Sequence, residues 1–396
     1  MDLLALVASG TAVDEYASDG PIPAPGQDCA APGIRAKPGA LLGLLDEPEL
    51  QRYRVARYEP MGEGSLLVIG GPRSGKSAAL ASVVAGFTPV GDADLFGADV
   101  EAVWDALVQA RRRLDAGGSP VARLLLLDDF DSVHARWDQE HRPAALELLA
   151  GLLRDGADGG VRIVVAAQRL TGSLQALPTL CQRRLVLRLA DVGEHVAAGG
   201  AAALFDDQLP PGGGTWQGHR IQLLAPEQGR AGPDGPGGPG SPGSLGLMKR
   251  PDAPTLPDVA ALLGLPGQTL LVVSGSPSRT AAALGAVPGA RVVDLAAASH
   301  DAIAEVAHAG APLRLSETQS GTAFVGDVDA WQAQWSLLGA LRPHADLVFD
   351  GCSLADYRAI SRRRDLPPPL APNRGRVWVL RPDGTVHRAT LRPPVA

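Results

Sequence analysis

Residues 70 to 77 carry the side chains and the spacing that can surround a phosphate group. They read Gly-Gly-Pro-Arg-Ser-Gly-Lys-Ser, which is the pattern G-x-x-x-x-G-K-S. In this pattern backbone N–H groups surround the phosphates, the lysine reaches the β and γ phosphates, and the last hydroxyl binds Mg²⁺. The candidate phosphate-binding residues are Gly70, Gly71, Pro72, Arg73, Ser74, Gly75, Lys76 and Ser77, and the candidate Mg²⁺ ligand among them is Ser77.

Lys76 is an exception in this chain. Of its 36 lysines and arginines, only three are lysines. A phosphate loop needs a compact charge on a thin stem, and a planar guanidinium does not replace it. The lysine that is retained here therefore supports a phosphate site.

The segments on either side of the loop have the composition of a strand and a helix. Residues 65–69, Ser-Leu-Leu-Val-Ile, are typical of a short buried strand, and residues 77–84 are typical of a helix. A strand, a glycine-rich turn and a helix N-terminus together bind anions. The alternative is a glycine-rich turn that matches the pattern by chance, but it leaves these two flanking segments unexplained.

Two acidic residues follow another apolar segment further along the chain. Residues 123–127, Arg-Leu-Leu-Leu-Leu, predict a central parallel strand that ends at Asp128 and Asp129. A Mg²⁺-ATP site needs an acidic residue at the tip of a strand that neighbours the loop. We expect Asp128 to hold Mg²⁺ through a water and Asp129 to orient the attacking water. A polar strand end without a catalytic role is the alternative.

A third polar position follows the next predicted strand, residues 161–166. Gln168 and Arg169 come at its end, where polar side chains can sense the γ phosphate at the carboxyl edge of the sheet. The alternative is an ordinary loop start. Arg183 or Arg184 is a candidate to act on the nucleotide of a neighbouring subunit, as arginine fingers do.

The chain of 396 residues is long enough for two domains. Residues 1–39 predict a loosely ordered lead-in, and residues 40–225 predict a first compact unit. Glycine and proline make up eleven of the sixteen residues from 231 to 246, a density that no helix or strand tolerates. Residues 226–255 are therefore the predicted linker, and residues 256–396 are the predicted second unit.

Strands and helices alternate along the first unit. Helices are predicted at 99–114 and 142–153, and strands at 123–127, 161–166 and 184–188. This alternation predicts an α/β fold with a parallel sheet flanked by helices.

The composition argues against some classes of protein. A net charge of −7 and a pI near 5.6 disfavour a generally basic surface that coats nucleic acid. Cys29, Cys181 and Cys352 are scattered, as expected for isolated thiols in a reducing compartment. Neither a signal peptide nor a run of eighteen apolar residues occurs in the sequence. We expect a cytoplasmic protein that meets the inner face of the membrane only through a partner or an upstream segment.

The second unit repeats the loop region of the first in altered form. Residues 270–284 align without a gap with residues 66–80, and Arg-Thr-Ala at 279–281 stands where the first unit has Gly-Lys-Ser. We therefore expect the second unit to keep the strand, loop and helix and to lose the phosphate chemistry.

The acidic strand repeats as well. Residues 325–329 align with residues 127–131, so that Gly326 replaces Asp128, and Trp335 then corresponds to Trp137. These losses predict that the second unit does not bind ATP by the usual route. Two unrelated strand–helix units are the alternative.

With these motifs the chain resembles the FtsK/SpoIIIE family of P-loop motor ATPases. It is most similar to the tandem-domain members, which include the EccC-type ATPases of type VII secretion and related actinobacterial proteins. The resemblance covers residues 40–225, with intact Walker A and B motifs, and extends to 256–391 as a degenerate ATPase domain. Other segments that carry it are 44–51, 209–216, 220–224 and 373–378.

The resemblance implies two RecA-like P-loop NTPase domains, the second degenerate, with ATP and Mg²⁺ as cofactors. It also implies a ring or stacked homo- or hetero-oligomer that moves DNA or a secreted polypeptide. Family members carry membrane anchors and often a further ATPase domain upstream, and this sequence contains neither. Active motors usually have Glu at the position of Asp129. Asp is one methylene shorter, and a misplacement of about 1 Å can lower the rate on the order of a hundredfold.

Two hypotheses of function remain open. The first is an ATPase motor subunit that couples ATP hydrolysis to moving a polymer. The second is a module that binds ATP, hydrolyses it poorly, holds an assembly together and docks a partner polypeptide on its second unit. Asp129 discriminates between them, because hydrolysis depends on it.

Overall fold

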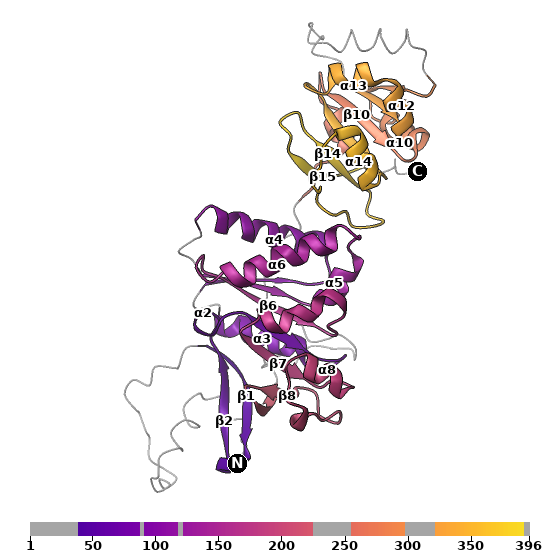
Figure 1. Cartoon of the computed structure of the whole chain (residues 1–396). Helices are drawn as coiled ribbons and strands as arrows, with labels where there is room; N and C mark the ends of the chain where they lie inside the picture. Colours follow the sequence, from indigo (N-terminus) through magenta and orange to yellow (C-terminus); the bar gives the residue numbers. More distant parts are fainter. Residues whose placement is uncertain (1–38, 88–90, 118–121, 225–254, 298–320, 392–396) are drawn as a thin grey trace, which may run out of the picture. The chain divides into compact units, whose positions relative to one another are not determined.

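The computed structural model describes residues 39–87, 91–117, 122–224, 255–297 and 321–391. The chain divides into two compact units between residues 252 and 253 (Figure 1). The predicted lead-in and the predicted linker lie outside the described residues, apart from residues 39 and 255. Both units are α/β folds with a sheet that is mainly parallel around the loop strand and is flanked by helices, so the predicted fold class is confirmed.

The first unit is built on a nine-stranded sheet in the order β2-β1-β9-β8-β7-β3-β6-β5-β4. The strands from β7 to β4 are parallel, and the pairs from β7 to β2 are antiparallel. The strands are β1 (Ala40–Glu47), β2 (Arg52–Tyr58), β3 (Leu66–Ile69), β4 (Asp92–Phe96), β5 (Arg123–Leu127), β6 (Val161–Ala167), β7 (Arg183–Leu187), β8 (Gly213–Trp216) and β9 (His219–Leu223).

Helices connect these strands. The α-helices are α2 (Pro60–Glu63), α3 (Lys76–Phe87), α4 (Val100–Asp115), α5 (Phe130–Arg136), α6 (His141–Asp155), α7 (Leu177–Leu180) and α8 (Val192–Ala197). Short 3₁₀ helices are η2 (Pro48–Leu50), η3 (Gly172–Ala176) and η4 (Ala202–Leu204). The predicted helices at 99–114 and 142–153 are α4 and α6, and the predicted strands of this unit are present to within one residue at each end.

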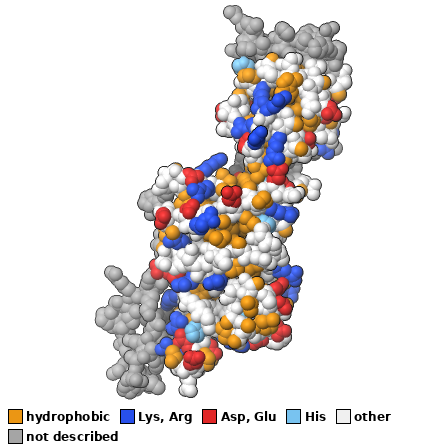
Figure 2. Space-filling view, in the orientation of Figure 1, with side chains coloured by type: hydrophobic (Ala, Val, Ile, Leu, Met, Phe, Trp, Pro, Cys, Tyr) orange, Lys and Arg blue, Asp and Glu red, His pale blue; other side chains and the backbone are white. Residues whose placement is uncertain are grey.

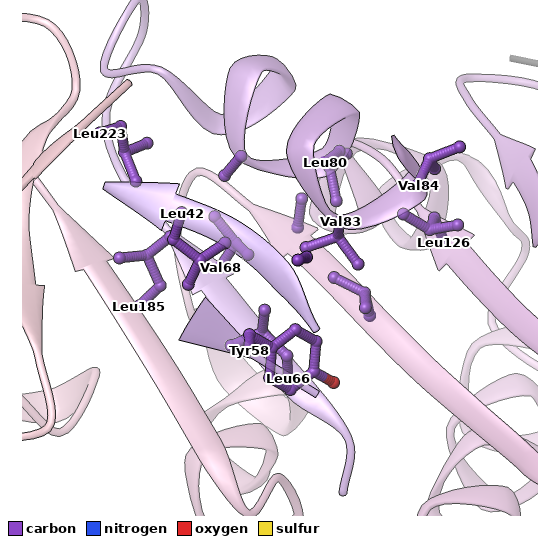
Figure 3. Packing of buried hydrophobic residues seen from close by; sticks show 14 of the residues in the cluster. Leu42, Tyr58, Leu66, Val68, Leu80, Val83, Val84, Leu126, Leu185 and Leu223 are labelled. Carbon is purple, nitrogen blue, oxygen red and sulfur yellow. The ribbon is translucent and has the colours of Figure 1, made fainter. Parts of the chain in front are cut away.

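Helix α3, which follows the loop, packs on one face of the sheet. Its Leu80, Val83 and Val84 point toward the strands, where Val68 of β3 lies in the same cluster (Figure 3). The next residue of β3, Ile69, belongs to a cluster on the other face. This alternation follows the period of two in a strand. The buried residues of β3 and α3 therefore anchor the loop between them at both ends.

Helices α4 and α6 lie beside each other, with β6 between this pair and α3 in Figure 1. Helix α4 begins after Asp99, whose carboxylate accepts hydrogen bonds from the N–H groups of Glu101 at 2.9 Å and Ala102 at 3.2 Å. Such a cap stabilises a helix by about 1 kcal/mol. The ring of Trp104 packs edge-on against Trp137, directly after α5, with centroids 6.2 Å apart. This packing fixes the helix that follows the acidic pair.

Of the strands that were not predicted, β2 and β4 form the two edges of the sheet, and β1 and β8 lie inside it. Strands β2 and β4, Arg-Tyr-Arg-Val-Ala-Arg-Tyr and Asp-Ala-Asp-Leu-Phe, each pair on one side within the described residues. Their polar residues hide the apolar pattern that marks a buried strand.

The second unit has a six-stranded sheet in the order β11-β12-β10-β13-β14-β15. Strands β11, β12, β10 and β13 are parallel, and β14 and β15 are antiparallel to their neighbours. The strands are β10 (Thr269–Ser274), β11 (Arg291–Asp294), β12 (Thr322–Gly326), β13 (Asp346–Asp350), β14 (Arg376–Leu380) and β15 (Val386–Thr390). The helices are α9 (Val259–Leu263), α10 (Pro277–Gly285), α12 (Val328–Ala333), α13 (Trp335–Leu341) and α14 (Leu354–Ser361).

The second sheet has no counterpart of β6 within the described ranges. In the first unit β6 separates the loop strand β3 from β5, whereas in the second unit β12 pairs directly with the loop strand β10. Residues 327–345, between β12 and β13, form only α12 and α13. Strand β13 takes the place of β7, because Gly275 N–H donates to Asp350 O at 2.9 Å as Gly71 N–H donates to Arg188 O. The strand–loop–helix is thus repeated, but the sheet around it is not.

The predicted counterpart of Trp137 differs from the buried tryptophan of the second unit. Trp137 is 2% exposed, whereas Trp335 is 37% exposed and lies under the guanidinium of Arg362, 4.3 Å from its ring centroid. Trp331 is fully buried and donates its Nε1–H to Val272 O at 2.9 Å. The helix is interrupted at Gln334, between α12 and α13. The gapless alignment with the first unit continues through this interruption and therefore matches Trp137 to the exposed Trp335 and not to the buried Trp331.

Candidate functional site

The turn from β3 to α3 begins with two glycines that neighbouring segments hold in place. Gly70 N–H donates to Ala167 O at the end of β6 at 3.2 Å, and Gly71 N–H donates to Arg188 O after β7 at 2.9 Å. A side chain at position 70 would not fit, because its Cβ would lie 2.5 Å from Oγ of Ser74. The segments on both sides of β3 therefore determine where the turn starts.

Gly75 ends the turn with a φ of +108°, which favours glycine. A Cβ there would lie 3.1 Å from Cα of Gly212, whose N–H donates to Ser74 O at 2.8 Å. Glycine is thus needed at 75 for its backbone conformation and at 70 for space. The hydroxyl of Ser74 is buried and has no hydrogen-bond partner among the described residues.

Lys76 is the first residue of α3, and its side chain turns back into the loop. Its Nζ donates to Gly70 O at 2.9 Å and to Gly71 O at 3.2 Å, and the residue is only 8% exposed. No described residue accepts a hydrogen bond from the backbone N–H groups of Gly75, Lys76 and Ser77. An ammonium has three donors, so one Nζ–H also remains after these two bonds. This set of donors, with its positive charge at a helix N-terminus, fits a phosphate group.

Asp128 and Asp129 turn the chain from β5 into α5. Asp128 N–H donates to Phe96 O at 2.8 Å and so extends the pairing of β5 with β4. Its Oδ1 accepts from the N–H of Asp129 at 2.9 Å. Asp129 has a φ of 47° and a ψ of 42°, a left-handed conformation that aspartate tolerates better than most residues. Backbone conformations of this kind cluster at functional sites.

Gln168 reaches Asp129 from the end of β6. Its Nε2 donates to Oδ1 of Asp129 at 3.3 Å. The residue predicted to orient the attacking water and the residue predicted to sense the γ phosphate are the two candidate catalytic residues, and they meet although they are 39 positions apart in the chain.

Asp131 also belongs to the site, although no role is predicted for it from the sequence. It lies in the first turn of α5, and its Oδ1 and Oδ2 accept from the N–H groups of Gln168 and Arg169, both at 3.2 Å. One carboxylate thereby ties the end of β6 to the start of α5, which carries Asp129. The only signal in the sequence is the spacing Asp-Asp-Phe-Asp, which does not reveal a partner in another strand.

The strand order corrects one prediction about Asp128. The sequence predicts that its strand lies next to that of the loop, but β6 lies between β5 and β3. Parallel strands are about 4.8 Å apart, so the axes of β3 and β5 are about 10 Å apart. Because the three strands are parallel, Gly70, Asp128 and Gln168 reach the same edge. This separation suits a hydrated cation between Asp128 and a phosphate in the loop.

No group of three or more His, Cys, Asp or Glu side chains in the described part of the chain is arranged to hold a metal ion. Mg²⁺ is usually held by one or two carboxylates together with water and substrate phosphates. Ser77 and Asp128 therefore fit Mg²⁺ that arrives with a nucleotide better than a resident metal.

Arg183 and Arg184 lie at the amino-terminal ends of the parallel strands, whereas the loop lies at their carboxyl-terminal ends. They begin β7, and Arg183 pairs with Leu66 at the start of β3. The guanidinium of Arg183 donates its Nε–H to Glu63 at 2.9 Å. Neither can serve the loop of its own unit, so a role toward a neighbouring subunit stays a prediction.

The corresponding loop of the second unit is closed by side chains. The hydroxyls of Ser274 and Thr280 are 2.8 Å apart, and both residues are 2% exposed. Thr280 Oγ1 donates to Oδ2 of Asp350 at 2.6 Å, and Ser274 Oγ donates to it at 3.2 Å. Thr280 stands where the first unit has Lys76. The second loop therefore contains the carboxylate of Asp350 where the first loop contains the ammonium of Lys76, and a carboxylate repels phosphate.

Comparisons with known proteins give similarities among solved structures only. No protein-family model matches the sequence, and no curated protein matches it. EssC (ATPases 2 and 3) from Geobacillus thermodenitrificans is 15% identical, with a TM-score of 0.45 over 94% of this chain and 100% of that chain. EccC (ATPases 2 and 3) of Thermomonospora curvata, in complex with a signal sequence peptide, is 13% identical, with a TM-score of 0.49 over 92% and 95%.

A more distant similarity is to the pCW3 conjugation coupling protein TcpA with ATPγS. It is 13% identical, with a TM-score of 0.37 over 48% of this chain and 67% of that chain. The first two structures are named EssC and EccC, and EccC is also the type of ATPase that the sequence resembles.

Proposed function

We propose that the chain binds Mg²⁺-ATP at the first unit and hydrolyses it as a subunit of a motor that moves a polymer. The observation that carries this proposal is the common edge of the sheet that the loop with Lys76 shares with Asp128, Asp129 and Gln168. Phosphoryl transfer needs positive charge at the β and γ phosphates and a group beyond them that orients the nucleophile.

Each residue of the site has a proposed role. Residues 70–76 hold the phosphates, and Ser77 and Asp128 bind Mg²⁺, Asp128 through water. Asp129 orients the attacking water, and Gln168 contacts both Asp129 and the γ phosphate. In this arrangement Asp131 is a positioning residue, because it holds the backbone that carries Gln168.

Nucleotide binding is tested with Lys76→Ala in the full chain. This variant should lose ATP binding in isothermal titration calorimetry, because the loop loses its only side-chain cation that is directed inward. Arg112→Ala is the matched control, since Arg112 is exposed on α4 and removes the same charge away from the site. Tight ATP binding by the Lys76→Ala variant would overturn the assignment of the site.

The polymer is DNA or a secreted polypeptide. The net charge of −7 disfavours DNA, and positive and negative side chains are interspersed on the face of the first unit in Figure 2. Thermomonospora curvata EccC was solved with a signal sequence peptide, so a peptide of that class is the second probe. ATP turnover that duplex DNA accelerates identifies a DNA translocase. Turnover that only the peptide raises identifies a polypeptide translocase.

A specific observation favours a second candidate, the ATP-binding docking module. Asp129 has a short side chain, which disfavours hydrolysis, and the second loop is closed by Asp350. In this module the first unit would hold ATP within a homo- or hetero-oligomer. The second unit would bind a partner. Single-turnover measurements separate the two functions. Bound ATP that stays uncleaved supports the module, and cleavage on every binding event supports the motor.

Localisation follows the same proposal. Within the described ranges, none of the helices combines the length and the apolar content needed to cross a bilayer. We place the chain in the cytoplasm, with any attachment to the inner face of the membrane made by a partner or an upstream segment.

A further inference from the structure

The second unit has a hollow beside the start of β13 and the end of β14, at the end of the sheet that is opposite to the closed loop. The hollow has a volume of about 410 Å³ and includes Leu347 and Leu380 in its lining. Leu347 and Leu380 pair at the start of β13 and the end of β14, whereas the closed loop follows the end of β10. The hollow is therefore not a remnant of the lost phosphate loop.

Arginines dominate the charge of this hollow. Arg342, Arg363 and Arg381 line it together with one carboxylate, that of Asp383, so the lining has a net charge of +2 (three minus one). Within the described residues, no carboxylate lies within 4.0 Å of the guanidinium of Arg342 or Arg381. Arg363 is the exception, because its Nε donates to Asp365 at 2.7 Å.

The carboxylate of Asp383 is already occupied by hydrogen bonds. Its Oδ1 accepts from the N–H of Thr385 at 2.8 Å and from Oγ1 of Thr385 at 2.7 Å. These hydrogen bonds are the main reason why the pKa of Asp383 is lowered. The local turn therefore uses this carboxylate. Arg381 interacts electrostatically with Asp383 and with Asp346, but it forms an ion pair with neither of them.

The side chains of two of the arginines and the backbone of the third are held by hydrogen bonds within the unit. Arg342 donates from Nη2 to Ser361 O at 2.6 Å, and Arg363 donates from Nη1 to Gly384 O at 2.8 Å. Arg381 begins a tight turn in which Gly384 N–H donates to Arg381 O at 2.9 Å. Gly384 has a φ of +85°, and a Cβ there would lie 2.9 Å from Nη1 of Arg363. Glycine thus permits both the turn and the approach of Arg363.

We propose that this hollow binds a small, multiply charged phosphate anion, as a free phosphate compound or as a lipid headgroup. Guanidinium groups bind phosphate through paired N–H donors, and three of them around one hollow suit a di- or polyanion. The volume lies within the range of about 300–1,000 Å³ that is typical of ligand pockets. The proposal does not depend on nucleotide binding by the first unit.

The test uses the full chain with Lys76→Ala, so that the loop of the first unit does not compete. Pyrophosphate is titrated by calorimetry, and cosedimentation with phosphatidylglycerol vesicles is measured in parallel. Arg342→Gln and Arg381→Gln should each weaken binding roughly tenfold or more, since each removes a charge-assisted hydrogen bond. Arg381→Lys should lie in between, because it keeps the charge and loses the paired donors.

Arg291→Gln is the matched control, because Arg291 is exposed at the start of β11 and does not line the hollow. It should bind both probes like the parent. Pyrophosphate binding that is lost in the arginine variants identifies a free phosphate ligand, and vesicle binding that is lost in them identifies a headgroup. The proposal is wrong if neither probe binds to the parent. It is equally wrong if the Arg342→Gln/Arg381→Gln double variant, with an unchanged melting temperature, binds as well as the control.

Discussion

Asp129 combines two features of the candidate site. Its backbone is left-handed, and its carboxylate meets the amide of Gln168 at 3.3 Å. Residues other than glycine adopt this conformation at a cost of roughly 1 kcal/mol, so the surrounding contacts must hold it. Gln168, at the end of β6, contacts the side chain of Asp129 directly, and its own backbone N–H is held by Asp131.

Asp129→Glu tests whether the short side chain limits hydrolysis. The extra methylene should bring the carboxylate closer to the attacking water and raise ATP turnover by about tenfold or more, since small misplacements have large effects on rate. ATP affinity should not change, because the loop is untouched. Steady-state turnover and calorimetry measure the two quantities. An unchanged or lower turnover would contradict the argument.

Asp131→Ala tests the positioning role. The N–H groups of Gln168 and Arg169 lose their acceptor, and we expect the free energy of unfolding to fall by about 1–3 kcal/mol. Turnover should fall while the Kd for ATP is retained, because the end of β6 no longer aligns Gln168. Urea unfolding and ATPase assays measure both effects. Asp158→Ala, an exposed aspartate of the same unit, is the control. A change in stability with turnover intact would leave Asp131 with a structural role only.

At the scale of elements, strand β6 distinguishes the two units. In the first unit it carries Gln168 to the edge of the sheet between the loop strand and the strand of Asp128. The second unit has no such strand in the part of the chain that the structure describes, and β12 lies directly beside β10. The acidic strand and the loop strand are then about 5 Å apart instead of about 10 Å. Restoring the lysine alone would not rebuild the space for a nucleotide with Mg²⁺.

Asp350→Ala tests whether the closed loop of the second unit is structural. The buried hydroxyls of Ser274 and Thr280 would lose their charged acceptor, and the unit should lose about 1–3 kcal/mol of stability. Asp329→Ala is the control, because Asp329 is exposed and such substitutions change stability by less than about 0.5 kcal/mol. Urea unfolding measures both variants. Equal stability of the two would show that the network contributes little.

At the scale of the whole molecule, the chain combines one unit with a proposed nucleotide site and one unit whose corresponding loop is closed. Each unit also contains one described cysteine. Burial raises the pKa of the Cys181 thiol to about 12, and burial likewise raises that of Cys352 to about 12. At pH 8 roughly one thiol in ten thousand is then ionised. The buried Cys181 should therefore resist alkylation until its unit opens, and the partly exposed Cys352 should react slowly because of its raised pKa.

Alkylation therefore reports where a ligand binds. Mg²⁺-ATP at about one hundred times its Kd stabilises the unit that binds it by about 2.7 kcal/mol. Labelling of Cys181 with iodoacetamide should slow by about a hundredfold, and labelling of Cys352 should not change. Mass spectrometry of peptides from the native chain measures both rates. Protection of Cys352 would contradict a single site, and Lys76→Ala should abolish the protection of Cys181.

Local features of the chain predicted much of this molecule. The loop, its flanking strand and helix, and the strands at 123–127 and 161–166 follow from short segments whose apolar pattern and glycines encode local conformation. The loss of the lysine in the second unit is also visible in the sequence, because the identity of one residue can be known without knowing which residues it contacts. The edge strands β2 and β4 carry too weak a pattern to be found in this way.

The amino-acid sequence by itself determined which chemical groups are available: Lys76 in one loop, Thr280 in the other, and acidic residues after one buried strand. Only the tertiary structure decided which of them meet. The insertion of β6 between β3 and β5, the contacts of Asp131 with residues 37 and 38 positions away, and the contact of Asp350 with Thr280 across 70 positions arise when the sheets assemble. Such pairings depend on strand order, which the composition and periodicity of single segments do not encode.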